Sequence, residues 1–189
     1  MVDKRTLEQL AQQAMREPRY PNPAIPPSKY YQFFRLLAAR IRPRYSVELG
    51  VCGGGGSLHL ALGYPHGAVL GVDLTNEYPD NIKHIQATCP NFTFWQMDAA
   101  EAAIKVEANG KYPIDILFID TVHTYDATIR EFNTWRPLMH RDGIVILDDL
   151  FRPGMLDAWN ELQGRDKIRL DFLHLGGAPT DGGLGCILL

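Results

Sequence analysis

A glycine-rich loop is the first feature of this sequence that could do chemistry. It follows Glu48, includes Gly50, Gly53 and Gly54, and ends at Ser57. Because glycines carry no side chains, the backbone there can approach a ligand closely, and the N-terminus of a following helix presents free amide groups. Four consecutive glycines exceed what a single tight turn requires. We therefore interpret this segment as a ligand-binding loop.

Two aspartates further along could bind the polar parts of a nucleoside. Asp73 ends an apolar run, where its carboxylate can accept hydrogen bonds from a ribose diol, which suits NAD and S-adenosylmethionine equally. A dinucleotide fingerprint starting at Gly53 requires a small residue where Leu58 stands, so the match to NAD-binding proteins fails there. Asp98 and Glu101 have the spacing of a helix N-cap and its capping-box partner, but a cap carboxylate can also accept from an exocyclic amine.

Three more aspartates form a second group of candidate residues. Asp120 ends one apolar run, and Asp148 and Asp149 end another. If these runs are neighbouring strands, about 4.8 Å apart, the three carboxylates face one small space and repel one another unless a cation lies between them. Oxygen ligands suit Mg²⁺, with Mn²⁺ or Ca²⁺ as alternatives. The competing interpretation is that Asp149 caps the following helix and that Asp120 is protonated or solvated.

The elements that must position these residues are short apolar runs alternating with helix-length segments. The expected strands are residues 46–49, 68–73, 92–96, 114–119, 143–147, 169–173 and 186–189. The expected helices are residues 57–62, 81–87, 99–108, 125–139 and 155–163. This alternation indicates an α/β fold with a mostly parallel sheet and helices on both faces. A turn-rich stretch separates the last two strands, so we expect them to pair antiparallel.

Residues 1–44 form a region of different character. They carry a net charge of +6, whereas residues 45–189 carry −9. Helical periodicity predicts a helix over 1–17 and a second one over 29–41, capped by Ser28. Five prolines between these helices exclude a regular element there, so we interpret the region as an N-terminal helical arm, with the proline-rich segment as a lid or linker. Its charges either remain solvated, dock on the body or help to hold an anionic ligand.

The composition limits the classes of protein that the chain can belong to. With 189 residues, 46% hydrophobic and a net charge of −3, the sequence fits one globular domain and is unlike a basic nucleic-acid-binding protein. Its longest apolar runs are strand-sized, far below the roughly 20 residues of a membrane helix. The cysteines Cys52, Cys89 and Cys186 fit no metal or disulfide pattern, so we interpret all three as packed thiols of a cytoplasmic protein.

The glycine loop and its acids resemble the successive motifs of class I S-adenosylmethionine-dependent methyltransferases. The resemblance covers about residues 45–189, which would be the methyltransferase domain, and implies a Rossmann-like sheet of seven strands. It also implies that the loop passes under the methionine part of the cofactor. By the same resemblance, Asp73 would hold the ribose hydroxyls and Asp98 the adenine amine. Cys52 stands where many such enzymes have a glycine.

The segment from Asp120 to Asp149 is similar to the small metal-dependent O-methyltransferases, especially those acting on sugar hydroxyls of macrolides. The shared pattern is Asp120-x-x-His123-x-Tyr125, followed by Asp148 and Asp149. The resemblance implies that the three aspartates bind a divalent cation, and that His123 is the general base, with Asp120 as the next candidate. Imidazole suits this role because it can accept a proton near neutral pH.

These observations predict methyl transfer from S-adenosylmethionine to a hydroxyl group of a small sugar-like or phenolic molecule, assisted by Mg²⁺ or another divalent cation. One alternative is a nicotinamide-dependent oxidoreductase on a similar sheet, and another is a sensor that binds nucleosides without catalysis. We expect neither a nucleic acid nor a membrane as partner. The sequence leaves open the methyl acceptor and whether the chain forms a homo-oligomer.

Overall fold

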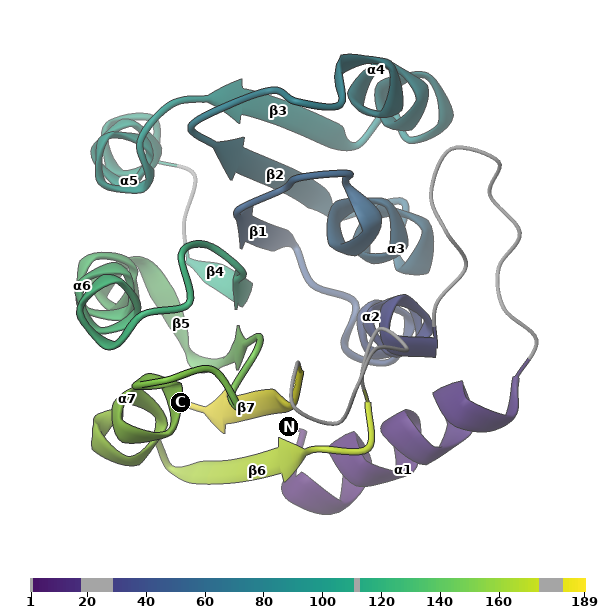
Figure 1. The fold of residues 1–189 in the computed structure, drawn as a ribbon. Helices are drawn as coiled ribbons and strands as arrows, with labels where there is room; N and C mark the ends of the chain where they lie inside the picture. The colour runs from purple at the N-terminus through teal and green to yellow at the C-terminus, as the bar shows by residue number, and fades with distance from the viewer. Residues whose placement is uncertain (1, 18–28, 111–112, 174–181) are drawn as a thin grey trace.

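The computed structural model describes residues 2–17, 29–110, 113–173 and 182–189 of the chain. A seven-stranded sheet in the order β3-β2-β1-β4-β5-β7-β6 runs through the molecule (Figure 1). Strand β7 pairs antiparallel with both β5 and β6, and the other pairs are parallel. The predicted α/β fold with an antiparallel last strand is therefore confirmed. The strands are β1 (Tyr45–Leu49), β2 (Ala68–Asp73), β3 (Phe92–Gln96), β4 (Ile114–Ile119), β5 (Met139–Leu147), β6 (Asp166–Leu170) and β7 (Leu184–Leu188).

Helices cover both faces of the sheet. Helices α2, α3 and α4 lie on one face and α5, α6 and α7 on the other, while α1 packs against α2 and β6 (Figure 1). A 3₁₀ turn over Arg136–Leu138 follows α6. The helices are α1 (Lys4–Arg16), α2 (Lys29–Ile41), α3 (Gly55–Gly63), α4 (Pro79–Thr88), α5 (Ala99–Ala108), α6 (Tyr125–Trp135) and α7 (Met155–Glu161).

The central strand β4 shows why the sheet is buried on both sides. Ile116 and Phe118 belong to the core under α2 and α3, whereas Leu117 and Ile119 belong to the core on the opposite face. All four side chains are buried, so the strand is a continuous apolar run instead of an alternating one. This rigid centre fixes the strand ends that carry the candidate residues.

Local capping chemistry sets where several helices begin. Asp3 accepts a hydrogen bond from the backbone N–H of Thr6 at the start of α1, and Thr124 accepts one from Ala127 at the start of α6. Pro79 occupies the first turn of α4, where the missing N–H costs nothing. Within the described residues, no helix is both long and apolar enough to cross a bilayer.

Several of the expected element boundaries are wrong. The helix expected over 125–139 ends at Trp135, because Pro137 supports only a 3₁₀ turn there, and β5 begins directly afterwards at Met139. The sixth strand is Asp166–Leu170 instead of 169–173. It is an edge strand with mostly polar residues, so its apolar pattern is weak.

The N-terminal arm is only partly described. Lys4 of α1 forms an ion pair with Asp166 of β6 at 2.9 Å, so at least one basic residue docks on the body. The proline-rich segment that we expected to act as a lid, together with its cap Ser28, lies outside the described residues. The division into an arm (1–44) and a main domain (45–189) stays a prediction.

Candidate functional site

A cavity of about 310 Å³ opens at the carboxyl ends of the parallel strands. It is lined by Gly50 after β1, Asp73 at the end of β2, Asp98 after β3 and Asp120 after β4. These four strands are adjacent in the sheet, so four residues predicted from separate sequence segments share one space. Open parallel sheets bind ligands at this edge.

The glycine loop is held from behind by a buried carboxyl group. Glu48 Oε2 accepts a hydrogen bond from the backbone N–H of Ser57 at 2.6 Å and a second one from the Ser57 hydroxyl. Burial raises the pKa of Glu48 from 4.5 to about 8, although the two hydrogen bonds from Ser57 counteract this shift. Glu48, Gly53, Gly54 and Ser57 do not line this cavity, and their role in cofactor binding stays a prediction.

Two glycines of the loop are required by the backbone. Gly50 has φ +83°, and a Cβ at this position would lie 2.0 Å from the carbonyl oxygen of Asp120. Gly54, also at φ +83°, is the N-cap of α3. Both conformations favour glycine. Gly50 therefore allows the chain after β1 to press against the chain after β4.

Asp73 already orders its surroundings through both carboxylate oxygens. Its Oδ2 accepts a hydrogen bond from the backbone N–H of Cys52 at 2.9 Å, and its Oδ1 accepts one from the N–H of Thr75 at 3.0 Å. Cys52 is exposed, lines the cavity and has φ +46°. The expectation of a packed thiol is wrong for Cys52, whereas Cys89 and Cys186 are buried.

The second predicted group comes together at the ends of β4 and β5. The backbone N–H of Asp120 donates to Leu49, and that of Asp148 donates to Ile119, so these residues prolong the sheet pairing. Burial raises the pKa of Asp120 well above its ordinary range, and the charge of Asp148 raises it further. Burial also raises the pKa of Asp148, followed by the charge of Asp149.

His123 lies between two of these acids. Its Nε2 atom is 3.6 Å from Asp120 Oδ1 and 3.6 Å from Asp149 Oδ2. His123 and Asp149 have φ values of +49° and +51°, which are uncommon for residues with side chains. Such strain is typical of functional sites, because the surrounding structure must hold it.

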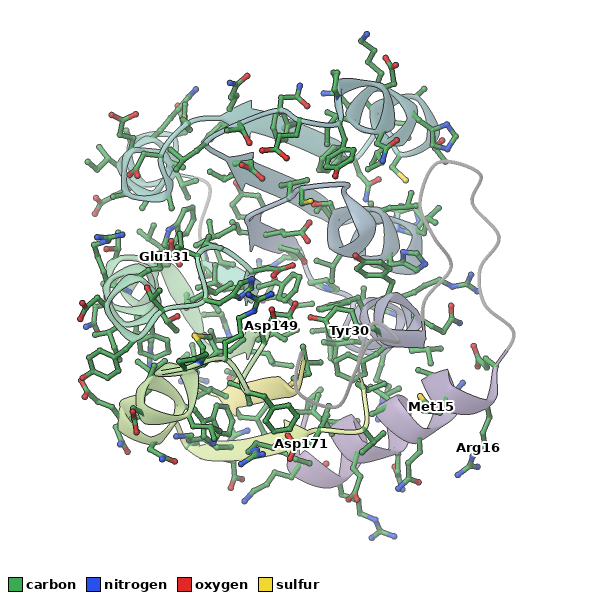
Figure 2. The ribbon with its side chains drawn as sticks, in the orientation of Figure 1. Met15, Arg16, Tyr30, Glu131, Asp149 and Asp171 are labelled. Atoms are coloured by element: carbon green, nitrogen blue, oxygen red, sulfur yellow. The ribbon has the colours of Figure 1, made fainter. Side chains whose placement is uncertain are left out.

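Two residues that we did not single out as site residues complete this group. Arg152 Nε lies 2.6 Å from Asp149 Oδ2. Tyr30 of α2 is fully buried, and burial together with the charges of Asp148 and Asp120 raises the pKa of its phenol well above the ordinary range. Figure 2 shows Tyr30 and Asp149 in the middle of the molecule, between the helices of the two faces.

The predicted metal site is not preformed in the described part of the chain. Within the described ranges, no three or more His, Cys, Asp or Glu side chains stand in an arrangement that could hold a metal ion. The carboxylate of Asp149 is paired with Arg152 instead. The alternative role of Asp149 as a helix cap is wrong, because the N-cap of α7 is Gly154.

Two further acids at the cavity, Asp98 and Glu131, differ in their surroundings. Asp98 is exposed and caps α5, where its Oδ1 accepts hydrogen bonds from the N–H groups of Ala100 at 2.7 Å and Glu101 at 3.3 Å. Glu131 of α6 is buried and accepts a hydrogen bond from the Thr121 hydroxyl at 2.7 Å. Both acids line the cavity.

Glu131 was not among the predicted site residues, although the sequence carries a signal for it. Glu131 stands four residues before Trp135 on α6, so helical spacing places it on the same stripe as a core tryptophan. A charged residue on a buried stripe needs a partner or a function. Arg152 and Tyr30 carry no comparable signal, because their positions depend on how the chain folds around the acids.

Comparisons with known proteins agree with this geometry. The family model described as "Methyltransferase domain" matches residues 47–150. These residues include the glycine loop and all the predicted acids. No curated protein sequence matches the chain.

Several solved structures share the fold at low sequence identity. An O-methyltransferase from Bacillus cereus in complex with SAH has a TM-score of 0.72 and 17% identity, over 100% of this chain and 93% of that one. Cofactor-bound Rv0187 from MTB has a TM-score of 0.70 and 18% identity, over 97% and 88%. The O-methyltransferase TomG from Streptomyces achromogenes, involved in tomaymycin synthesis and in complex with SAM, has a TM-score of 0.67 and 20% identity, over 100% and 91%.

Proposed function

Because the chain belongs to the methyltransferase-domain family, we propose that it transfers a methyl group from S-adenosylmethionine to a hydroxyl oxygen of a small molecule. One observation carries the proposal: the cavity is lined by Gly50, Asp73, Asp98 and Asp120 at four adjacent strand ends. Asp73 stands between the loop and the far acids, where it can bind the ribose. The methionine part then lies beside Gly50 and Asp120, and the base lies towards Asp98.

The acid group next to the methionine end supports transfer to oxygen. An acceptor hydroxyl must lose a proton as the methyl group arrives, and His123, 3.6 Å from both Asp120 and Asp149, is the residue that we propose as the base. Its Nε2 faces the acids, so this is the atom that would receive the proton. Holding donor and acceptor in line supplies much of the rate of such a displacement.

The proposal includes a divalent cation, with Mg²⁺ as the first candidate. The donor chemistry fits, because Asp120, Asp148 and Asp149 offer carboxylate oxygens, which such cations prefer. Burial and neighbouring carboxylates raise the pKa values of Asp120 and Asp148, and a cation bound between them would favour their charged forms. For the third carboxylate to become a ligand, Asp149 must leave Arg152. When bound, a cation would stabilise the alkoxide form of the acceptor.

The cofactor proposal is tested by isothermal titration calorimetry of the chain with S-adenosylhomocysteine and with NAD. We expect binding of S-adenosylhomocysteine and no comparable binding of NAD. Tight NAD binding with no response to S-adenosylhomocysteine would favour the oxidoreductase alternative. Binding without methyl transfer to any acceptor would favour the nucleoside sensor.

Oxygen transfer and metal dependence are tested together with labelled S-adenosylmethionine. Sugar-like and phenolic hydroxyl compounds serve as acceptors, with added Mg²⁺ or with excess chelator. We expect transfer to at least one hydroxyl compound that chelator abolishes and Mg²⁺ restores. Full transfer in chelator would remove the metal from the mechanism while leaving the cofactor proposal in place.

A cytoplasmic location is also part of the proposal. Cys52, Cys89 and Cys186 are free thiols, which supports a reducing, cytoplasmic location. The partner expected from the site is a small-molecule acceptor, and a homo-oligomer is left open.

A further inference from the structure

Glu131 is a buried acid that the proposed reaction does not use. It is 7% exposed, lies on α6 and lines the cavity (Figure 2). The Thr121 hydroxyl donates to its Oε2 at 2.7 Å. The described part of the chain offers no hydrogen-bond donor to the other oxygen, Oε1. Oε1 is not one of the buried atoms that lack a partner, so it is open to the cavity, where a ligand can supply a donor.

The position of Glu131 indicates which part of a ligand it meets. Gly50, Asp73 and Asp120 line the cavity at the ends of β1, β2 and β4. Glu131 lies between the turns after β3 and β4, because it is hydrogen-bonded to Thr121 and lines a second, smaller pocket together with Asp98. If the cofactor binds as proposed, the sulfur lies beside Gly50 and Asp120, the ribose beside Asp73 and the base towards Asp98. The base is then also beside Glu131.

Asp98 is less suited to recognise the base, although it lies at the same end. Its side chain is exposed, and its Oδ1 already accepts hydrogen bonds from two N–H groups of α5. An exposed acceptor can bond to water when a ligand offers no donor, so it discriminates weakly between ligands. A buried acceptor has no such replacement and is left unpaired by a ligand without a donor. Discrimination between bases therefore belongs to Glu131.

We infer that Glu131 selects adenine, accepting a hydrogen bond from its 6-amino group through Oε1. Thr121 orients the carboxyl group by holding Oε2. A purine with an oxo group at position 6 places an oxygen where a donor is needed, so it binds poorly. Glu131 is thus a specificity-determining residue, and this inference rests on the proposed cofactor site.

Two ligands that differ at this one group provide the test. The full chain is titrated by calorimetry with S-adenosylhomocysteine and with S-inosylhomocysteine, its 6-oxo analogue. We expect the adenosyl ligand to bind about 10- to 100-fold more tightly, the effect of one charged hydrogen bond. The ratio of the two dissociation constants is the readout, because a purely structural role of Glu131 would weaken both ligands equally.

Variants assign that ratio to one side chain. Glu131→Leu should reduce it to near one, and Glu131→Gln, which keeps an acceptor oxygen, should restore most of it. Thr121→Val should lower it partly, because Oε2 loses the hydroxyl that orients it. Asp98→Asn tests the alternative acceptor and should leave the ratio unchanged, and exposed Glu101→Gln on α5 is the control. Thermal melts establish that each variant is folded. If Glu131→Leu does not fold, the ratios measured for Glu131→Gln and Thr121→Val test the role of Glu131.

The outcomes separate this inference from the proposed function. Failure of the wild-type chain to bind S-adenosylhomocysteine overturns both. Binding without preference for the adenosyl ligand, or a preference that survives Glu131→Leu, overturns only the role of Glu131. A preference lost in Asp98→Asn and kept in Glu131→Leu assigns recognition of the amine to Asp98.

Discussion

The candidate site has two parts that are stabilised in different ways. At the proposed nucleoside end, Asp73 and Asp98 accept hydrogen bonds from backbone N–H groups and hold their loops in place. At the acid end, formed by Asp120, Asp148 and Asp149, burial and the charge of Asp148 raise the pKa of Asp120, and Asp149 is paired with Arg152. The acids of the nucleoside end already have their hydrogen-bond partners, whereas the proposed three-carboxylate cation site would require Asp149 to leave Arg152.

Gly50 lies against the backbone of Asp120, so Gly50→Ala should have the largest effect on binding and stability. The added Cβ would lie 2.0 Å from the carbonyl oxygen of Asp120, at φ +83°. We expect loss of S-adenosylhomocysteine binding in calorimetry and a loss of more than about 3 kcal/mol in unfolding free energy. Gly110→Ala is the control, because Gly110 has φ +61° but nothing within 4 Å. Equal losses in both variants would show that backbone strain alone accounts for the effect.

His123→Ala should disable only the acid end. Turnover should fall about 10²- to 10⁴-fold, the usual contribution of a positioned base, while the affinity for S-adenosylhomocysteine stays the same. The measurement is steady-state methyl transfer beside calorimetry, with exposed His66→Ala as control. Unchanged turnover would assign the base to another residue, with Asp120 as the next candidate.

Glu48 should make stability depend on pH. Its pKa is about 8 in the folded chain against an ordinary value of 4.5, so the stability it contributes is full below about 4.5 and is lost as pH rises to about 8. Relative to Glu48→Gln, the wild type should lose about 3–4 kcal/mol of unfolding free energy between pH 5 and 8. Urea denaturation measures this, with exposed Glu107→Gln as control. Parallel curves for the wild type and Glu48→Gln would contradict it.

Asp73→Ala should disable only the nucleoside end, with the smallest effect of the four. Calorimetry should show a loss of about 1.5–3 kcal/mol in binding of S-adenosylhomocysteine, because the ribose loses a charged acceptor. Asp80→Ala on α4 is the control, since its side chain is 94% exposed. An unchanged dissociation constant in Asp73→Ala would place the ribose elsewhere.

Much of the fold was predictable because it depends on local patterns. The strands ending at Leu49, Asp73, Gln96, Ile119 and Leu147 were predicted with their correct ends, since each is an apolar run followed by a polar or glycine-rich turn. The match of a methyltransferase family to residues 47–150 confirms the resemblance to class I methyltransferases. The sixth strand was misplaced because it is a polar edge strand.

The site was less predictable where it depends on tertiary contacts. Asp73, Asp98 and Asp120 line one cavity as their strand ends predict. The pairing of Asp149 with Arg152 and the burial of Tyr30 beside the acids depend on loop and helix packing that no local pattern encodes. The specific roles of these residues in binding and catalysis stay predictions.

A crystal structure of the chain with S-adenosylhomocysteine tests the account most directly. We predict the sulfur beside Gly50 and Asp120, the ribose hydroxyls on Asp73, and the base at the end lined by Asp98 and Glu131. A nucleoside bound in the reverse direction would contradict the account. So would one bound in the cavity of about 320 Å³ lined by Arg44 and Thr93.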